Sequence, residues 1–115
     1  NHRIRKIVID NGTVTTLAGS SSGFADNATG TSASFYYPRA ITTDGTNLYV
    51  ADTNNNRIRK IVISTGVVTT LAGSSSGNTD ATGTSATFNY PIGITTDGTN
   101  LYVSDTYNHR IRKIE

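Results

Sequence analysis

The sequence predicts an all-β repeat protein made of four-stranded antiparallel units. The first observation is a period near fifty residues: the run RIRKI begins at Arg3, Arg57 and Arg110, which are 54 and 53 residues apart. The second is identity between the copies, because TTLAGSSSG and ITTDGTNLYV each occur twice. The third is that no stretch has helical periodicity. A period of this length is typical of propellers, solenoids and arrays.

Each unit is expected to hold four strands separated by turns. In the complete copy they cover residues 38–43, 47–51, 57–63 and 67–72. The first ends at an Asp-Gly dipeptide, which is a strong signal for a tight turn. The second alternates apolar positions with the period of two that strands show. Pro38 and its counterpart begin their strands, where a missing N–H is tolerated.

The remaining segments predict how the units are joined. Apolar residues recur near the ends of two long connections, so we expect these connections to be anchored crossovers between sheets. Four antiparallel strands followed by a crossover form the blade of a β-propeller, and the chain therefore holds about two blades. We divide it into strands three and four of a partial blade at 1–18, a crossover at 19–37, a complete blade at 38–72, a second crossover at 73–90, and strands one to three of a further blade at 91–115.

Four recurring phrases resemble the NHL-repeat family of β-propellers, in its bacterial form. They are N-x-R-I-R-K-I, V-T-T-L-A-G, A-x-F-x-x-P-x-x-I and L-Y-V-A-D, and they cover essentially the whole chain. The resemblance implies that the strands starting at Pro38 and Pro91 line a central channel and that residues 67–72 lie outermost. It also implies six blades in a closed ring, and the binding of proteins, RNA or ligands. A minority of the family are metal-dependent lyases or hydrolases.

The number of blades predicts association. Two blades cannot close a ring, since repeat proteins need at least about three units to bury a continuous core. Unpaired strand edges also invite pairing with another chain. We expect either three copies that close a six-bladed ring, or a segment of a longer array or filament. Residues 108–114 duplicate residues 1–7, and this redundant third strand favours the array.

The charged residues recur with the repeat. The chain has 10 basic and 8 acidic residues and a net charge of +2, and all basic residues except Arg39 lie in the three RIRK phrases. Because successive strand residues face opposite ways, such a run cannot form one dense basic patch. We interpret the charges as an internally paired surface rather than a nucleic-acid footprint. Structural roles, with the acids accepting backbone N–H bonds in turns, are expected for Arg3, Arg57, Arg110, Asp44, Asp97, Asp52 and Asp105.

The composition argues against catalysis and metal binding. There is no Cys, and the two histidines, His2 and His109, share one repeat position. A metal site needs several convergent ligands, and the metal-dependent enzymes of the family use several histidines near the channel, which are missing here. An active site also needs one unrepeated constellation, whereas nearly everything in this chain is duplicated. We predict no enzymatic activity, no metal and no cofactor.

Differences between the copies suggest where a partner could bind. Phe24, Tyr36, Arg39 and Tyr107 lie at divergent positions of the crossover, the channel strand and a turn. They are the candidate contact residues, with neutral drift at tolerant positions as the alternative.

The predicted function is a non-catalytic, structural and self-assembling repeat module. Its expected location is outside the cell or on the surface of a bacterium or archaeon, since Thr, Ser, Asn and Gly dominate the chain. The alternative is a ligand- or protein-binding sensor or receptor propeller, completed to six blades by oligomerisation. Expected partners are copies of the chain itself, with other proteins or glycans as further candidates. Neither nucleic acid binding nor membrane insertion is expected.

Overall fold

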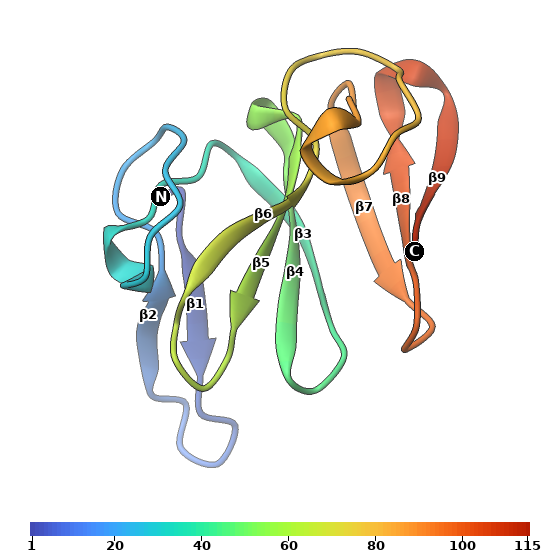
Figure 1. The fold of residues 1–115 in the computed structure, drawn as a ribbon. Coiled ribbons are helices and arrows are strands. Elements are labelled where there is room, and N and C mark those ends of the chain that lie inside the picture. The colour runs from blue at the N-terminus through green and yellow to red at the C-terminus, as the bar shows by residue number, and fades with distance from the viewer.

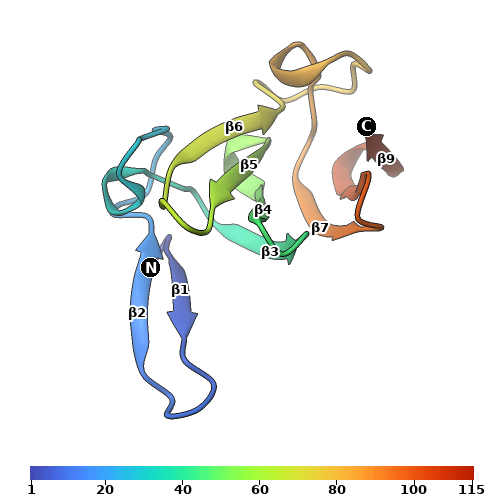
Figure 2. The ribbon, with the colours of Figure 1, turned by 60° about the horizontal axis from the view of Figure 1, so that its bottom comes forward.

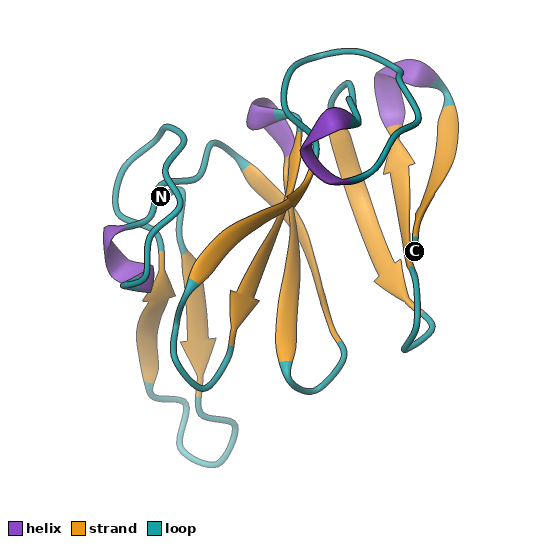
Figure 3. Ribbon diagram, in the orientation of Figure 1, coloured by secondary structure: helices purple, strands orange, loops and turns teal.

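The computed structural model describes all residues, 1–115, and its regular structure is made of β-strands with four short 3-10 turns (Figures 1 and 3). The all-β prediction is therefore confirmed. The strands are β1 (Ile4–Ile7), β2 (Val14–Ala18), β3 (Pro38–Thr43), β4 (Asn47–Asp52), β5 (Arg57–Val62), β6 (Val68–Ala72), β7 (Pro91–Thr96), β8 (Leu101–Asp105) and β9 (Arg110–Ile114). The turns are η1 (Gly30–Ser32), η2 (Thr53–Asn55), η3 (Gly83–Ser85) and η4 (Thr106–Asn108).

The strands form three antiparallel sheets, and within each sheet the order follows the chain. The sheets are β1-β2, β3-β4-β5-β6 and β7-β8-β9. They stand beside one another like the blades of a propeller, and β3 contacts β7 on the inner side (Figure 2). This arrangement confirms the predicted strand order and the inner position of the strands that begin at Pro38 and Pro91.

The turn between β3 and β4 shows how local chemistry positions the strands. Gly45 has a φ of +92°, a left-handed conformation that glycine adopts without steric cost. One Asp44 carboxylate oxygen accepts the backbone N–H groups of Thr46 at 2.9 Å and Asn47 at 2.7 Å. These bonds, together with one from the Tyr49 hydroxyl, lower the pKa of Asp44 from 3.8 to about 2. Asp97 occupies the same position in the β7–β8 turn and makes the equivalent bonds.

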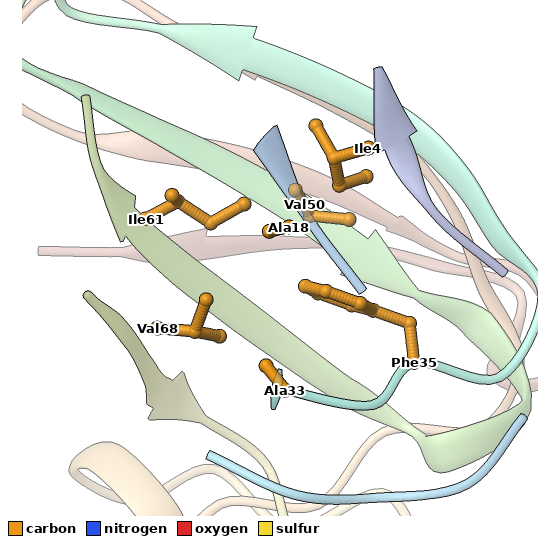
Figure 4. Packing of buried hydrophobic residues seen from close by; sticks show 7 residues of the cluster. All are labelled: Ile4, Ala18, Ala33, Phe35, Val50, Ile61 and Val68. Carbon is orange, nitrogen blue, oxygen red and sulfur yellow. The ribbon is translucent and has the colours of Figure 1, made fainter. Parts of the chain in front are cut away.

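The apolar core lies between the blades, so both faces of a central blade are buried. Ile61 belongs to the cluster between the first two sheets, and Ile58 of the same strand belongs to the cluster between the second and third. Both side chains are completely buried. The first cluster is drawn in Figure 4 and consists of Ile4, Ala18, Ala33, Phe35, Val50, Ile61 and Val68.

The crossovers are anchored in these clusters. Phe35 and Phe88 occupy equivalent crossover positions and are almost fully buried. Backbone bonds tie each crossover to itself and to the next blade: the Gly23 N–H donates to the Phe35 carbonyl, and Asn27 pairs with Val68 of β6. The long connections are therefore packed, ordered parts of the blade architecture.

Candidate binding face

A β-bulge at the start of β3 turns Arg39 away from the regular strand pattern. The pairing of β3 with β4 shifts between Pro38 and Ala40, which leaves Arg39 without a partner residue. Bulges re-aim side chains and are frequent near functional sites. The Arg39 guanidinium Nη2 donates to the Tyr90 hydroxyl at 2.8 Å. It lies 5.8 Å from the ring centre of Tyr37 and 5.3 Å from that of Tyr90. Arg39 therefore connects the residue that precedes the first strand of one blade, Tyr37, with the equivalent residue of the next blade, Tyr90.

Tyr37 and Tyr90 are held by residues of the preceding blade. Both have positive φ angles, 53° and 60°, which are uncommon for residues other than glycine. The Tyr37 N–H donates to His2 Nδ1 at 3.1 Å, and the Tyr90 N–H donates to Asn56 Oδ1 at 2.8 Å. His2 and Asn56 are themselves left-handed residues at the same repeat position. A repeated hydrogen bond thus fixes the tyrosine at each blade junction.

The rings around Arg39 form one continuous surface. His2 lies 5.7 Å from Tyr36 and 4.8 Å from Tyr37, and the two tyrosine rings are 5.4 Å apart. On the other side, Tyr90 and Tyr107 stack at 4.5 Å with an interplanar angle of 11°. We call the aromatic face the set of His2, Tyr36, Tyr37, Arg39, Tyr90 and Tyr107.

The aromatic face is accessible and carries a cation without an acidic partner. Tyr36, Tyr37 and Tyr107 are 39%, 50% and 58% exposed. Arg39 is exposed as well, and it takes part in none of the ion pairs of the chain. Exposed tyrosines around an arginine are the side chains most enriched at the centres of protein interfaces. An anionic group on a partner would meet an unpaired guanidinium here.

The structure brings together three of the four contact residues proposed from the sequence. Tyr36, Arg39 and Tyr107 lie on the aromatic face, whereas Phe24 lies outside it. The guanidinium carbon of Arg57 sits 3.8 Å from the ring centre of Phe24, in a cation–π contact. His2, Tyr37 and Tyr90 of the aromatic face were not among the predicted contact residues. That prediction used positions at which the two copies differ, whereas Tyr37 and Tyr90 are the same residue at the same repeat position, directly before a proline.

The charged repeat positions have a different pattern from the one expected. Arg3, Arg57 and Arg110 make no ion pair; the buried pairs use Arg59 and Arg112, the second arginines of the last two RIRK phrases. Arg59 donates to Asp52 at 2.7 Å and to Asp26 at 2.8 Å.

Further bonds from Arg59 tie the crossover to the blade. Its guanidinium also donates to the carbonyl oxygens of Ala25 and Ser34 in the crossover. The same network recurs around Arg112, with Asp105 at 2.7 Å and the crossover residue Asp80. Each network therefore locks a crossover onto the blade that follows it.

Asp52 and Asp105 are buried ion-pair partners rather than turn residues. One oxygen of Asp52 accepts the N–H of Tyr36 in the crossover, and the other binds Arg59 and the Asn55 amide. Burial raises the pKa of Asp52, while these hydrogen bonds and the Arg59 charge act in the opposite direction. The carboxylate oxygens of Asp52 and Asp105 are thus occupied by hydrogen bonds that join the strands of the blade and the crossover.

No group of three or more His, Cys, Asp or Glu side chains is placed to hold a metal ion. His2 and His109 lie at equivalent repeat positions just before β1 and β9, so they belong to the first and third sheets and are far apart in the chain. No helix has the length and apolar character required to cross a membrane.

The sequential antiparallel strands, the crossovers and the inner position of β3 and β7 define a segment of a β-propeller. Its repeats are of the NHL type: the family model of the NHL repeat matches residues 35–61 and 88–114. The chain is therefore an NHL-repeat protein, which confirms the resemblance seen in its recurring phrases.

Relatives of this chain are much longer. NHL repeat-containing protein 2 of Homo sapiens is 34% identical over 125 residues, which covers 97% of this chain and 17% of that protein. The Gallus gallus protein of the same name is 37% identical over 81 residues, or 69% of this chain and 11% of that protein. The chain therefore spans less than a fifth of either relative.

Solved structures share the fold. A structural genomics protein of unknown function from Bacteroides thetaiotaomicron superposes with a TM-score of 0.87 at 30% identity, covering 97% of this chain and 29% of that one. An auxiliary nutrient binding protein from Bacteroides ovatus has a TM-score of 0.83 at 27% identity, covering 99% of this chain and 32% of that one. The chain thus corresponds to about a third of each of these structures.

Proposed function

We propose that this chain supplies blades to a larger NHL propeller and acts there as a non-catalytic module that binds another protein through the aromatic face. The observation that carries the proposal is the position of Arg39, which joins Tyr37 and Tyr90 across a blade junction. In the second copy Ile92 stands at the position of Arg39, although the surrounding repeats are nearly identical. The two copies therefore differ at a residue of the aromatic face, which supports a binding role for this surface.

The chemistry of the face favours a protein partner with an acidic group. Tyrosine offers a large rigid ring with a polar tip, so it binds with little loss of side-chain entropy. Arginine adds a guanidinium that pairs with a carboxylate in two parallel bonds. The name of the Bacteroides ovatus structure, an auxiliary nutrient binding protein, lends support to a binding role at the level of the fold.

A photo-cross-linking experiment tests this proposal. A benzoylphenylalanine at position 36 should capture the partner, and the affinity of the purified pair is then measured by calorimetry. Arg39→Ile and Tyr107→Asn each install the residue of the other copy, so the fold should tolerate them. We expect each to weaken binding about tenfold or more, as for hot-spot residues. Phe24→Asn, outside the face, is the matched control; equal affinities for all three variants would refute the proposal.

A second candidate function is a structural, self-assembling module. The observation that favours it is the near-identity of the two copies, in which TTLAGSSSG and ITTDGTNLYV each occur twice. Identical repeats present the same surface more than once, so each copy can make the same contact. The two functions are compatible, since completing the ring would also complete the series of blade junctions that forms the aromatic face.

We also propose an extracellular or cell-surface location in a bacterium or archaeon. The basis is compositional: the chain is rich in Thr, Ser, Asn and Gly. Protease treatment of intact cells tests this location, because a surface protein is digested before a cytoplasmic marker. Survival of the protein until the cells are lysed would contradict it.

The absence of catalysis belongs to the same proposal. Asp52 and Asp105 are neutralised by buried arginines, and Asp44 and Asp97 are bound by backbone N–H groups. None of these carboxylates is free to transfer a proton. Purified chain should show no turnover of phosphate esters, carboxylate esters or lactones, and activity that survives further purification and disappears in Asp52→Asn would contradict this.

A further inference from the structure

We propose that protonation of His2 loosens the aromatic face, so that binding through this face weakens as the pH falls from about 8 to about 5. This inference rests on the proposed function, because it names a regulation of the same surface. It is carried by a comparison within the molecule, in which two blade junctions make the same hydrogen bond through side chains of different chemistry.

The bond at the first junction needs a neutral histidine. The Tyr37 N–H donates to His2 Nδ1 at 3.1 Å, so this nitrogen offers a lone pair and the proton of the neutral ring sits on Nε2. A protonated imidazole carries an N–H on both nitrogens and has no acceptor left. Histidine is the side chain that changes charge in the range between about pH 5 and pH 8. Protonation of His2 therefore removes the acceptor of the Tyr37 N–H.

The second junction makes the same bond with a group that does not titrate. The Tyr90 N–H donates to Asn56 Oδ1 at 2.8 Å, and an amide oxygen accepts a hydrogen bond throughout this pH range. His2 and Asn56 have almost the same backbone conformation, with φ angles of 54° and 55°. The two junctions are therefore alike in geometry, and only the first is expected to respond to pH.

The backbone of Tyr37 makes the first junction sensitive to this loss. Its φ of 53° lies in the left-handed region, which is disfavoured for a residue with a side chain. Such a conformation persists only where the surrounding contacts hold it. Without the bond to His2, the backbone of Tyr37 can relax towards the extended conformation. The Tyr37 ring then leaves its place 5.8 Å from the guanidinium of Arg39.

The charges around His2 favour the same outcome. The ionisable side chains on the elements packed around it are Tyr36 and Tyr37 of the crossover, Arg39 and Asp52 of the next blade, and Arg3 beside it in the chain. His2 takes part in none of the ion pairs of the chain, and Asp52 is already paired with Arg59. A proton on His2 thus adds a positive charge to a region whose unpaired charges are also positive, which disfavours the compact arrangement around Tyr37.

The new charge would also attract an acidic partner, but this effect is the smaller one. Attraction between exposed charges is screened by salt and is weak. Displacement of Tyr37 removes a whole ring from the surface, and a few rings of this kind carry most of the binding free energy of an interface. A loss of affinity at low pH is therefore the expected net result.

Amide exchange with water, followed by NMR, tests the first step without a partner. The protection of the Tyr37 and Tyr90 amides is measured at pH 8 and at pH 5. Both residues are tyrosines that precede a proline, so the ratio of their protection removes most of the intrinsic effect of pH on exchange. We expect the protection of Tyr37 relative to Tyr90 to fall about threefold to tenfold at pH 5, which corresponds to the loss of one hydrogen bond.

Two variants exchange the residues of the two junctions. His2→Asn keeps an acceptor for Tyr37 and leaves the Asn1 amino group in place, so the ratio should no longer change with pH. Asn56→His makes the reciprocal change, and the Tyr90 amide should then lose protection at pH 5 as well. A ratio that stays constant in the natural chain, or that changes equally in His2→Asn, would overturn the inference.

Affinity measurements on the partner captured at position 36 separate this inference from the proposed function. From pH 8 to pH 5 the natural chain should lose about threefold to tenfold more affinity than His2→Asn, whatever the affinity of that variant at pH 8. Equal pH dependence of the two proteins, with binding still weakened by Arg39→Ile, would overturn the regulation and leave the binding face standing. If Arg39→Ile has no effect on affinity, the proposed function fails and the regulation of binding fails with it, even where the Tyr37 amide responds to pH.

Discussion

Arg59 donates a hydrogen bond to Asp52 at 2.7 Å, and neither side chain is accessible to solvent. The pair connects the second and third strands of the blade, and Arg59 extends it to Asp26 in the crossover. Two charges of opposite sign can be buried together when hydrogen bonds satisfy their remaining polar atoms. The buried pair therefore adds a charged network to the two apolar clusters that form the interior of the repeats.

We predict that Arg59→Met strongly destabilises the chain. The change leaves Asp52 buried without its cation, and breaking a buried pair in this way costs about 3–5 kcal/mol. Urea unfolding followed by circular dichroism measures the loss. Arg57→Met is the control: it removes a partly exposed cation–π contact with Phe24, worth about 0.5–1 kcal/mol, and one hydrogen bond to the Asn55 carbonyl oxygen at 3.1 Å. Equal losses for the two variants would show that the buried pair has no special role.

The acid response should depend on the two Asp-Gly turns. Because the folded state lowers the pKa of Asp44 from 3.8 to about 2, the unfolded chain binds more protons between these values. The stabilisation from Asp44 is therefore complete above pH 4 and is lost as the pH falls towards 2. Backbone hydrogen bonds lower the pKa of Asp97 in the same direction.

The test compares melting temperatures of the natural chain and the Asp44→Asn/Asp97→Asn variant from pH 6 to pH 2. The difference between the two proteins should shrink as the pH falls, since protonation removes the charge that the variant lacks. Asp10→Asn, in the β1–β2 turn, provides the control. A difference that stays constant with pH would contradict the assignment.

The bond from Tyr90 to Asn56 should be essential to the blade junction. Asn56→Gly keeps the left-handed backbone but removes the acceptor, and it should cost about 0.5–1.5 kcal/mol. Asn56→Ala adds the strain of a left-handed residue with a side chain, about 1–2 kcal/mol more. His2→Asn installs the residue of the complete copy and should be neutral. Thermal unfolding of the three variants checks this order, and an alanine variant as stable as the glycine variant would contradict it.

Glycine at position 73 is required by packing as well as by conformation. Gly73 and Gly45 have almost the same φ, +91° and +92°, so alanine is equally strained at both. A Cβ at position 73 would lie 2.5 Å from the Asn56 carbonyl oxygen, whereas nothing lies within 4 Å at position 45. Gly73→Ala should therefore be less stable than Gly45→Ala by about 1–3 kcal/mol. Equal melting temperatures for the two variants would exclude a packing role.

The strands could be predicted because their sequences and the turn residues between them occur in both copies of the repeat. Each observed strand of the complete blade begins and ends within one residue of its predicted bounds, and β3 agrees at both ends. Turn residues such as Asp44 and Gly45 mark the same boundaries in both copies. Local chemistry and repetition were sufficient there, because hairpins join strands that are neighbours in the chain.

The buried pairs and the aromatic face could not be predicted in the same way. Arg57 and Arg59 belong to the same phrase, and only the packing of a crossover over β5 decides that Arg59 is enclosed and Arg57 is not. Arg39 and Tyr90 are 51 residues apart. Their contact depends on the twist between blades, which no local pattern in the sequence encodes. Contacts of this kind require the arrangement of whole blades.

The proposed function places this chain beside further blades, either copies of itself or blades of a longer propeller. Only 23 of the 115 residues are buried. Folding costs about 1–2 kcal/mol of backbone entropy per residue, and we expect contacts with further blades to supply part of the apolar burial that offsets it. Light scattering coupled to size-exclusion chromatography measures the mass directly. The account predicts assemblies of several copies, and a monodisperse 12.2 kDa monomer that unfolds cooperatively would contradict it.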